Sequence, residues 1–548
     1  MTEFISLSSL EKVFLDYKKP KKEFLKMSVM KNERFSYQIA YIRKDDDNSA
    51  ENIYFKVSVK SPLKKYITIR RVENVGAAFT HYPNECDDDY LKKKPGLYPD
   101  PLFELENSEI TASVLYNSLW ISVDTKGEVP PGTYNIDITF KSANQKCTKT
   151  FELEIKKSSL PEQDIMFTQW FHCDCIADAY DVKIFSKKHW DMIKSFAKTA
   201  VNNGINTILT PVLTPPLDTQ IGGERPTVQL VDVIKNENSY TFGFEKFHKW
   251  VDIMHQCGVK YFEISHLFTQ WGAKAAPKVV AKVNGKTKRI FGWDTASDSA
   301  EYKEFLDAFL PAFTNEIRKL KIENNCIFHV SDEPHGDEQL KSYMAAKNIV
   351  KKHLNGFKIM DALSSVDFYK AGAVENPIPS TNNIEPFLEC GIKDLWTYYC
   401  CGQNKEVCNR FMDMPSYRNR AIALQLFKYN IKGFLQWGYN FYYSMHSKRK
   451  INPFMTTDAG NSFPAGDAFS VYPGKKGAIE SLRICVFYDA LQDLRALKKL
   501  ESFIGHEKTV EFVQSFFEME ITFKKYPKSA DALLKFRDEL NKKIDSFI

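Results

Sequence analysis

The chain has 548 residues and a small net charge of +6; 43% of its residues are hydrophobic, 26% are charged and 14% are aromatic. This length exceeds one ordinary hydrophobic core and indicates roughly two to four domains. So small a net charge argues against a dedicated nucleic-acid binder, whose basic residues cluster more strongly. No run of about 18 apolar residues occurs, so the sequence predicts no membrane span.

The cysteines and the N-terminal residues indicate a cytoplasmic protein. Eleven cysteines show no disulfide-framework spacing, and several lie in apolar runs, where cysteine behaves as a small hydrophobic residue. The stretch MTEFISLSSLEKVFLDYKKP has no basic segment followed by an apolar one, so no secretory signal is visible. We therefore expect a reduced, cytoplasmic protein, and we expect no cofactor.

Residues 1–160 are predicted to form a β-sandwich. Alternating apolar and polar positions recur in six segments without helical periodicity between them, at residues 36–42, 53–59, 66–72, 119–125, 133–140 and 149–155. Charged or Gly/Pro turns separate these segments, as expected for the strands of a sandwich. The polar stretch KKSSLPEQD that follows is predicted to be a linker.

Residues 161–500 alternate between strand and helix patterns. Strands are expected at 165–171, 205–211, 259–265, 326–333, 357–363, 376–384, 394–400 and 433–439, with helices between most of them. Eight strands in this alternation predict a (β/α)8 barrel. The first strand is followed by no glycine-rich loop, which counts against a dinucleotide-binding doubly wound sheet. Residues 501–548 are expected to form amphipathic helices.

Polar and aromatic side chains gather where the predicted barrel strands end. Barrel enzymes carry their chemistry at the carboxyl ends of the strands and in the loops that follow. These positions hold Trp170, His172, Asp174, Glu263, His266, Trp271, Trp293, Asp332, Glu333, His335, Asp361, Trp396, Tyr398, Tyr399, Trp437, Tyr439 and Asn440. Lysine and arginine are nearly missing from this set, which suits a neutral carbohydrate; a phosphate would call for arginine or a glycine-rich loop.

The adjacent carboxylates Asp332 and Glu333 end the fourth strand, in CIFHVSDEPH. Most glycosidases place two carboxyl groups on opposite sides of the scissile bond, about 5–5.5 Å apart for retention and about 6.5–9.5 Å for inversion. Neighbours on a strand point to opposite faces, and Pro334 favours an extended Glu333. The pair is therefore poorly placed to act as an acid plus a protein nucleophile.

A different division of labour suits the pair. One carboxyl group protonates the leaving oxygen, and the other orients a 2-acetamido group of the substrate, whose carbonyl oxygen attacks the anomeric carbon. The structural alternative is that Asp332 caps the following helix while Glu333 pairs with a lysine.

Several stretches resemble glycoside hydrolase family 123, the retaining β-N-acetylgalactosaminidases. The resemblance rests on TQWFHCDCIADAY, SHLFTQWGAKAAPK, FHVSDEPH and KGFLQWGYNFYY, with SLRICVFYDALQDLRAL as a looser match. It covers the barrel and, more loosely, the sandwich. It implies an exo-acting, substrate-assisted, retaining hydrolase of glycans or glycoconjugates with terminal β-linked N-acetylgalactosamine. It also implies that Glu333 is the general acid/base and that Asp332 polarises and orients the acetamido group.

The other residues at the strand ends are assigned to substrate binding, each against a structural alternative. We expect Trp437 to wall the sugar pocket, Tyr398 rather than Tyr399 to donate a hydrogen bond to the acetamide carbonyl, and His172 with Asp174 to bind sugar hydroxyls. The same set includes Trp170, His266, Trp271, His335 and Tyr439, with Trp271 and, more weakly, Trp293 in a loop that forms a lid or an aglycone subsite.

Three alternatives to this function stay open at the level of sequence. The first is a hydrolase of another 2-acetamido sugar, and the second is an enzyme with a protein nucleophile such as Glu263. The third is a non-catalytic glycan-binding protein. A metal site is not expected, since HCDC is not followed by histidines in metal-like spacing at later strand ends.

Overall fold

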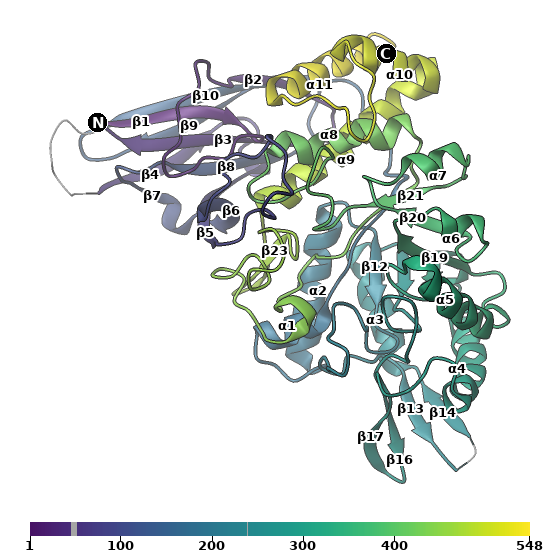
Figure 1. Ribbon diagram of the computed structural model, residues 1–548. Helices are drawn as coiled ribbons and strands as arrows, with labels where there is room; N and C mark the ends of the chain where they lie inside the picture. The colour runs from purple at the N-terminus through teal and green to yellow at the C-terminus, as the bar shows by residue number, and fades with distance from the viewer. Residues whose placement is uncertain (45–51, 238) are drawn as a thin grey trace.

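The computed structural model describes residues 1–44, 52–237 and 239–548, and it begins with a β-sandwich (Figure 1). One sheet has the strand order β1-β3-β8-β5-β6 and the other β2-β10-β9-β4-β7. The strands are β1 (Thr2–Ser8), β2 (Lys26–Val29), β3 (Arg34–Arg43), β4 (Ile53–Lys60), β5 (Ile67–Ala77), β6 (Gly96–Glu104), β7 (Glu109–Ala112), β8 (Asn117–Asp124), β9 (Gly132–Lys141) and β10 (Lys146–Ile155). The predicted sandwich is confirmed, and every one of the six predicted strands is present.

A nearly closed barrel of eight parallel strands follows, as predicted. Its strands are β11 (Met166–Gln169), β12 (Thr207–Thr210), β15 (Tyr261–Ile264), β18 (Cys326–Phe328), β19 (Lys358–Leu363), β20 (Asn376–Pro379), β21 (Trp396–Tyr398) and β22 (Gly433–Gln436). Their order is β20-β19-β18-β15-β12-β11-β22-β21. A single parallel bridge between Ser380 and Tyr398 brings the end of the sixth strand beside the seventh and nearly closes the barrel. All carboxyl ends therefore meet at one rim.

Helices cover the barrel where the apolar periodicity predicted them. They are α2 (Lys187–Asn202), α3 (Glu245–Cys257), α4 (Ala300–Lys319), α5 (Gly336–Lys351) and α8 (Ser416–Lys428), with short α1 (Cys173–Ala179), α6 (Asp367–Lys370) and α7 (Glu385–Glu389). The side chain of Ser186 accepts a hydrogen bond from the backbone N–H of His189 at the start of α2 and so caps this helix. Gly258, with φ 99°, ends α3 in the left-handed conformation that glycine tolerates.

The segments that follow the second and the third barrel strands each contain two short strands that were not predicted. A small sheet of order β14-β13-β16-β17 stands out from the barrel at the lower end of Figure 1. Its strands are β13 (Asp232–Lys235), β14 (Tyr240–Gly243), β16 (Val279–Val283) and β17 (Lys286–Phe291). Short strands paired outside the main barrel give too weak an alternation to be recognised in sequence.

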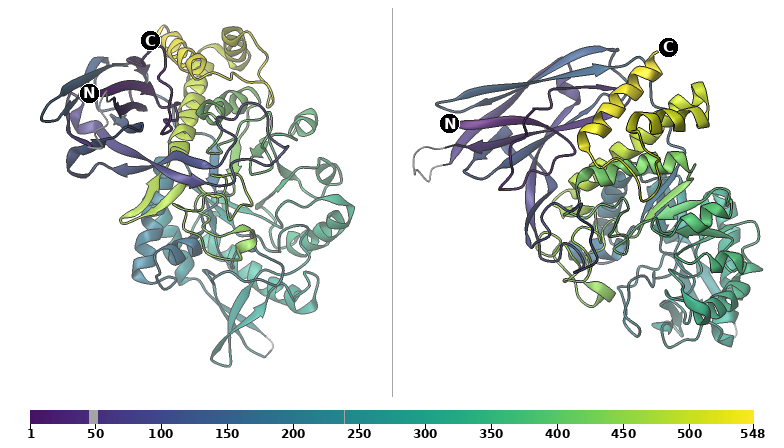
Figure 2. Two further views of the ribbon diagram at one scale, coloured as in Figure 1. Left: turned by 60° about the vertical axis from the view of Figure 1, so that its left-hand side comes forward. Right: turned by 45° about the horizontal axis from the view of Figure 1, so that its top comes forward.

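The chain ends in α9 (Leu482–Ile504), α10 (His506–Phe517) and α11 (Ala530–Asp545), after the hairpin of β23 (Val471–Gly474) and β24 (Gly477–Glu480). The boundary predicted at residue 500 falls inside α9. Helix α11 contacts both β2 of the sandwich and α8 of the barrel, and both views of Figure 2 show it beside the sandwich. Within the described residues, no helix is both long and apolar enough to cross a membrane.

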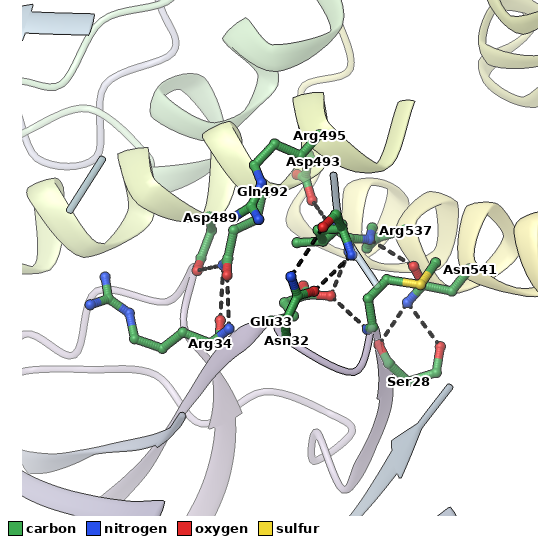
Figure 3. Close-up of polar contacts among 12 residues, drawn as sticks. Ser28, Asn32, Glu33, Arg34, Asp489, Gln492, Asp493, Arg495, Arg537 and Asn541 are labelled. Atoms are coloured by element: carbon green, nitrogen blue, oxygen red, sulfur yellow. Dashed lines mark hydrogen bonds and ion pairs between the residues drawn. The ribbon is translucent and has the colours of Figure 1, made fainter. Parts of the chain in front are cut away.

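Buried charges join these parts of the molecule (Figure 3). The Arg537 guanidinium on α11 donates to Glu33 of the sandwich at 2.5 Å and to Asp493 of α9 at 2.7 Å. Arg420 of α8 holds the same Asp493 with two hydrogen bonds of 2.6 and 2.9 Å. Each carboxylate is thus satisfied by a partner from a different part of the chain, as buried charges require.

A second contact runs from the sandwich to the barrel loops. The buried ammonium of Lys12 donates to the backbone carbonyls of Phe411, Met412 and Met414 at 3.2, 2.7 and 2.6 Å. Between β5 and β6, the Tyr82 hydroxyl donates to the carbonyl of Ser462 at 3.1 Å. Loops that follow the last two barrel strands are therefore fastened to the sandwich.

Candidate active site

A pocket of about 140 Å³ opens at the carboxyl ends of the barrel strands. Most of the strands or the loops that follow them contribute to its wall, which consists of Trp170, Leu217, Asp218, Gln270, Trp271, Asp332, Glu333, Ala362, Tyr398, Cys400, Cys401, Leu435, Trp437 and Phe463. Apolar and aromatic side chains surround a few polar groups, which is the usual composition of a small-molecule site. The predicted residues Asp332, Glu333, Trp170, Trp271, Tyr398 and Trp437 all lie in this wall.

Asp332 and Glu333 lie on a turn rather than on the fourth strand. Strand β18 ends at Phe328, and Glu333 has φ 42°. The extended backbone expected before Pro334 is therefore wrong, and Glu333 takes the left-handed conformation that residues other than glycine seldom adopt. Such strained residues gather at functional sites. Here the turn lets two consecutive carboxyl groups line the same pocket.

The two carboxyl groups differ in what holds them. The Tyr398 hydroxyl donates to Glu333 Oε1 at 2.5 Å. The backbone carbonyl of Asp332 accepts from the N–H of Trp271 at 2.9 Å, while the carboxylate of Asp332 has no hydrogen bond to any described residue of the protein. One carboxyl group is thus held in place, and the other is free to receive a ligand.

Burial raises the pKa values of both groups, and like charge adds to the shift at Asp332. Burial raises the pKa of Asp332 well above its ordinary value, and the charges of Glu333, Asp361 and Asp218 raise it further. Burial also raises the pKa of Glu333, although the hydrogen bond from Tyr398 opposes this shift. Two close carboxyl groups do not both ionise readily, so this environment favours the protonated form, in which a general acid acts.

The two tyrosines at the end of the seventh strand differ in position, while the expected hydrogen bond from Tyr398 to the acetamide carbonyl stays a prediction. Tyr398 faces the pocket, whereas the Tyr399 hydroxyl donates to Asn419 Oδ1 at 3.3 Å in the barrel wall. Trp437 lines the pocket from the eighth strand, and its indole N–H donates to Asp467 Oδ2 at 2.8 Å. The bond to Asp467 fixes the orientation of the Trp437 ring beside the pocket.

Beneath the pocket, buried charged side chains fill the barrel interior. His329 lies between Glu263 Oε1, 3.2 Å from its Nε2, and Asp361 Oδ1, 3.4 Å from its Nδ1. Although burial would lower its pKa, the hydrogen bonds that its ring donates to these two carboxylates, and their negative charges, raise the pKa of His329 to about 10. Glu263 also accepts from Thr168 and from the indole of Trp170. Glu263 does not line the pocket, and both of its oxygens are engaged.

His266 lies in the same interior, away from the pocket wall. Its ring stacks on His329 with 4.7 Å between ring centroids, and neither ring nitrogen has a hydrogen bond within the described chain. His266, His329 and Asp361 offer ligand atoms within 4.8 Å of one another. The ring N–H groups of His329 face its two carboxylates. Asp361 also accepts hydrogen bonds from the Val330 N–H and the Tyr343 hydroxyl. Of these three residues, only His266 has ring nitrogens that are free to bind a metal ion, so the group does not fit a metal site.

His172 and Asp174 lie behind the pocket wall. The Asp174 carboxylate holds the buried guanidinium of Arg225 with two hydrogen bonds of 2.8 Å. His172 contacts Arg225 through Nδ1 at 3.1 Å and the Trp437 carbonyl through Nε2 at 3.0 Å. Arg225 in turn donates to the Leu217 carbonyl at 3.0 Å. These residues support the loop that carries Leu217 rather than line the pocket.

Three further predicted residues also lie outside the pocket wall. The Tyr439 hydroxyl donates to the Phe196 carbonyl at 2.8 Å in the helix-packed core. His335 is exposed at the start of α5, with Nδ1 3.4 Å from the Glu333 carbonyl. Trp293 lines a neighbouring cavity of about 160 Å³ next to the small sheet.

Several residues of the pocket wall were not predicted. Asp218 follows the second barrel strand, Cys400 and Cys401 follow the seventh, and Phe463 comes from the long loop after the eighth. The rule that found the other residues applies equally to Asp218 and to the two cysteines, since each lies just beyond a strand end. Phe463 lies 27 residues after Gln436, the last residue of β22, and carries no such signal.

Comparisons with known proteins identify the family of this chain. Residues 170–500 match the model of the glycoside hydrolase 123 catalytic domain. A family 123 glycoside hydrolase from Clostridium perfringens, whose structure addressed glycolipid glycan hydrolysis, is similar over 100% of this chain and 98% of its own, with a TM-score of 0.73 and 14% identity. The comparison with a β-glucuronidase from Parabacteroides merdae covers 85% of this chain and 51% of the β-glucuronidase chain, with a TM-score of 0.31 and 11% identity. Comparison with curated proteins gave no match.

Proposed function

Because this chain belongs to glycoside hydrolase family 123, we propose that it removes terminal β-linked N-acetylgalactosamine from glycans or glycoconjugates by a substrate-assisted, retaining mechanism. The observation that carries the proposal is the pair of consecutive carboxyl groups on one turn, Glu333 held by Tyr398 and Asp332 without a partner. A pocket of about 140 Å³ suits one sugar residue, which supports exo action.

In the first step, Glu333 protonates the glycosidic oxygen as the substrate's acetamido carbonyl oxygen attacks C1. The bond to the leaving group breaks, and a cyclic oxazolinium ion forms. The carboxylate of Asp332 accepts a hydrogen bond from the acetamido N–H and stabilises the positive charge that develops there. In the second step, Glu333 takes a proton from water, which attacks C1 and opens the ring with overall retention.

The other residues of the wall have supporting roles in this proposal. Trp437 offers a flat apolar face to the sugar ring. Tyr398 keeps Glu333 oriented for proton transfer. A protein nucleophile at Glu263 is less well supported, because that carboxylate is buried below the pocket and engaged by His329, Thr168 and Trp170. The eleven free cysteines support a reducing, cytoplasmic location.

The test is the release of p-nitrophenol from the β-N-acetylgalactosaminide, the β-N-acetylglucosaminide and the β-galactoside. Turnover of an acetamido sugar but not of the plain galactoside is expected, and the faster acetamido sugar identifies the preferred epimer. Glu263→Gln is expected to keep the activity. Asp332→Asn slows intermediate formation even with this good leaving group, whereas Glu333→Gln impairs poor leaving groups most.

Contrary results would identify the alternatives. Turnover of the plain galactoside, or an inactive Glu263→Gln variant, would exclude the substrate amide as the nucleophile. If wild type and all three variants are inactive on all three sugars, glycan binding without turnover becomes the better description.

A further inference from the structure

We propose that Asp218 is a specificity-determining residue that accepts a hydrogen bond from a sugar hydroxyl and restricts the pocket to uncharged terminal sugars. This inference rests on the proposed function and names the substrate class more narrowly. The chemistry that the pocket selects is a neutral hexosamine without sulfate or carboxylate substituents.

The backbone of Asp218 is fixed by contacts to two neighbouring loops. Its N–H donates to Gln270 Oε1 at 2.6 Å, and its carbonyl accepts from the Ser447 hydroxyl at 2.6 Å. The preceding residue, Leu217, is held through its carbonyl by the buried Arg225. Asp218 has φ 39°, a left-handed conformation that aspartate tolerates better than most residues. A loop this constrained presents one orientation of its side chain.

The carboxylate of Asp218 is only half satisfied by the protein. Its Oδ2 accepts from the backbone N–H of His446 at 2.9 Å, while Oδ1 has no hydrogen bond within the described chain and the residue lines the pocket. Burial raises the pKa of Asp218 to about 6, although the His446 N–H and the charges of His446 and Arg225 oppose the shift. A partly buried carboxylate oxygen without a donor is a site for a ligand hydroxyl.

The ionisable carboxyl groups of the pocket wall give it negative charge only. Asp218, Asp332 and Glu333 all line it, and among its described wall residues there is no lysine, arginine or histidine. The guanidinium of Arg225, which holds the Leu217 carbonyl next to Asp218, is buried and paired with Asp174. A sulfate or carboxylate on the bound sugar would face three carboxyl groups with no cationic side chain among the described wall residues to pair with it, which buried charges do not tolerate. A hydroxyl at the same position would instead donate to Asp218 Oδ1.

The experiment compares p-nitrophenyl β-N-acetylgalactosaminide with its 6-O-sulfate, for wild type and Asp218→Asn. Turnover is measured together with calorimetric binding of the two free sugars. In wild type, the neutral substrate should exceed the sulfate at least about a hundredfold in kcat/KM. Asp218→Asn should lose about tenfold or more in kcat/KM on the neutral substrate, as expected for a hydrogen bond to a charged group. The ratio of kcat/KM between the neutral and the sulfated substrate should become smaller in this variant.

Two control variants separate this role from a structural one. Ser447→Ala loosens the same loop but keeps the carboxylate, and Asp294→Asn removes one negative charge outside this pocket. Both should leave the ratio of neutral to sulfated substrate unchanged. Because the charge of Asp218 raises the pKa of Asp332, the acid limb of the kcat/KM profile should move to lower pH in Asp218→Asn but not in either control.

Each contrary outcome has a definite meaning. An unchanged ratio in Asp218→Asn, or wild type that binds neither sugar, overturns the inference. Loss of all turnover in Asp218→Asn, restored by azide with formation of a glycosyl azide, would make Asp218 a nucleophile and also overturn it. Binding that depends on Asp218 in a wild type without turnover would refute the proposed function and keep the inference.

Discussion

Replacing Tyr398 with phenylalanine tests whether Glu333 is the proton donor. The Tyr398 hydroxyl donates to Glu333 Oε1 at 2.5 Å, and this bond lowers the pKa of Glu333 against the effect of burial. A hydrogen bond to an ionised group contributes about 1.5–3 kcal/mol, and one pKa unit corresponds to about 1.4 kcal/mol. Tyr398→Phe should therefore raise the pKa of Glu333 by about one to two units.

The sign of the kinetic effect follows from the role of Glu333. A general acid is active while it is protonated. A higher pKa of Glu333 therefore moves the alkaline limb of the kcat/KM profile to higher pH, by about the same one to two units as the change in pKa. The assay is the pH dependence of hydrolysis of phenyl β-N-acetylgalactosaminide, whose poor leaving group needs the proton. Tyr399→Phe is the matched control, because its hydroxyl contacts Asn419 instead. An alkaline limb that stays in place in Tyr398→Phe would refute the assignment of Glu333 as the acid.

Three further predictions concern stability and access to the pocket. A Cβ on Gly433 would lie 2.0 Å from the Trp396 ring, so Gly433→Ala should destabilise the barrel by about 1–3 kcal/mol or more; an unchanged urea midpoint would contradict this packing. Arg537→Met leaves buried carboxylates without their partner and should cost about 3–5 kcal/mol, measured by chemical unfolding, where a loss below about 1 kcal/mol would disprove the importance of the network. Cys400 lines the pocket, and the pKa of its thiol is raised well above the ordinary value. A maleimide should therefore inactivate the enzyme faster as pH rises, and N-acetylgalactosamine should protect it. The control variant Cys390→Ser should be inactivated like wild type, and equal inactivation of Cys400→Ser would refute the role of this thiol.

The architecture was predictable because most of its strands are central. The six sandwich strands that the alternation identified are the inner strands of the two sheets, whereas the four that it missed, β1, β2, β6 and β7, are the four sheet edges. Three of these edge strands are short or carry proline, since β2 and β7 have four residues each and β6 holds Pro99 and Pro101, as strands that pair on one side only tolerate. Their sequences therefore show the alternation less clearly.

The site was predictable where residue type and position agreed. Asp332, Glu333, Tyr398 and Trp437 lie at strand ends and in the pocket wall. The left-handed Glu333 was not predictable, because the preference of a residue before proline is local and the surrounding fold overrides it. His172 was assigned to the pocket by its position alone. Its ring is instead held by Arg225, which lies 53 residues further along the chain and which no local pattern connects to it.

The contacts between the sandwich and the barrel loops limit how these two parts can be recombined. Lys12 donates hydrogen bonds to the loop at residues 411–414. Tyr82 donates one to the residue before Phe463, which lies in the pocket wall. An exchange of the sandwich for that of a distant relative would remove supports from two of the loops that shape the pocket. Such a chimaera is expected to change in substrate preference as well as in stability. Evolution can therefore alter what this pocket accepts through substitutions in a domain that never touches the sugar.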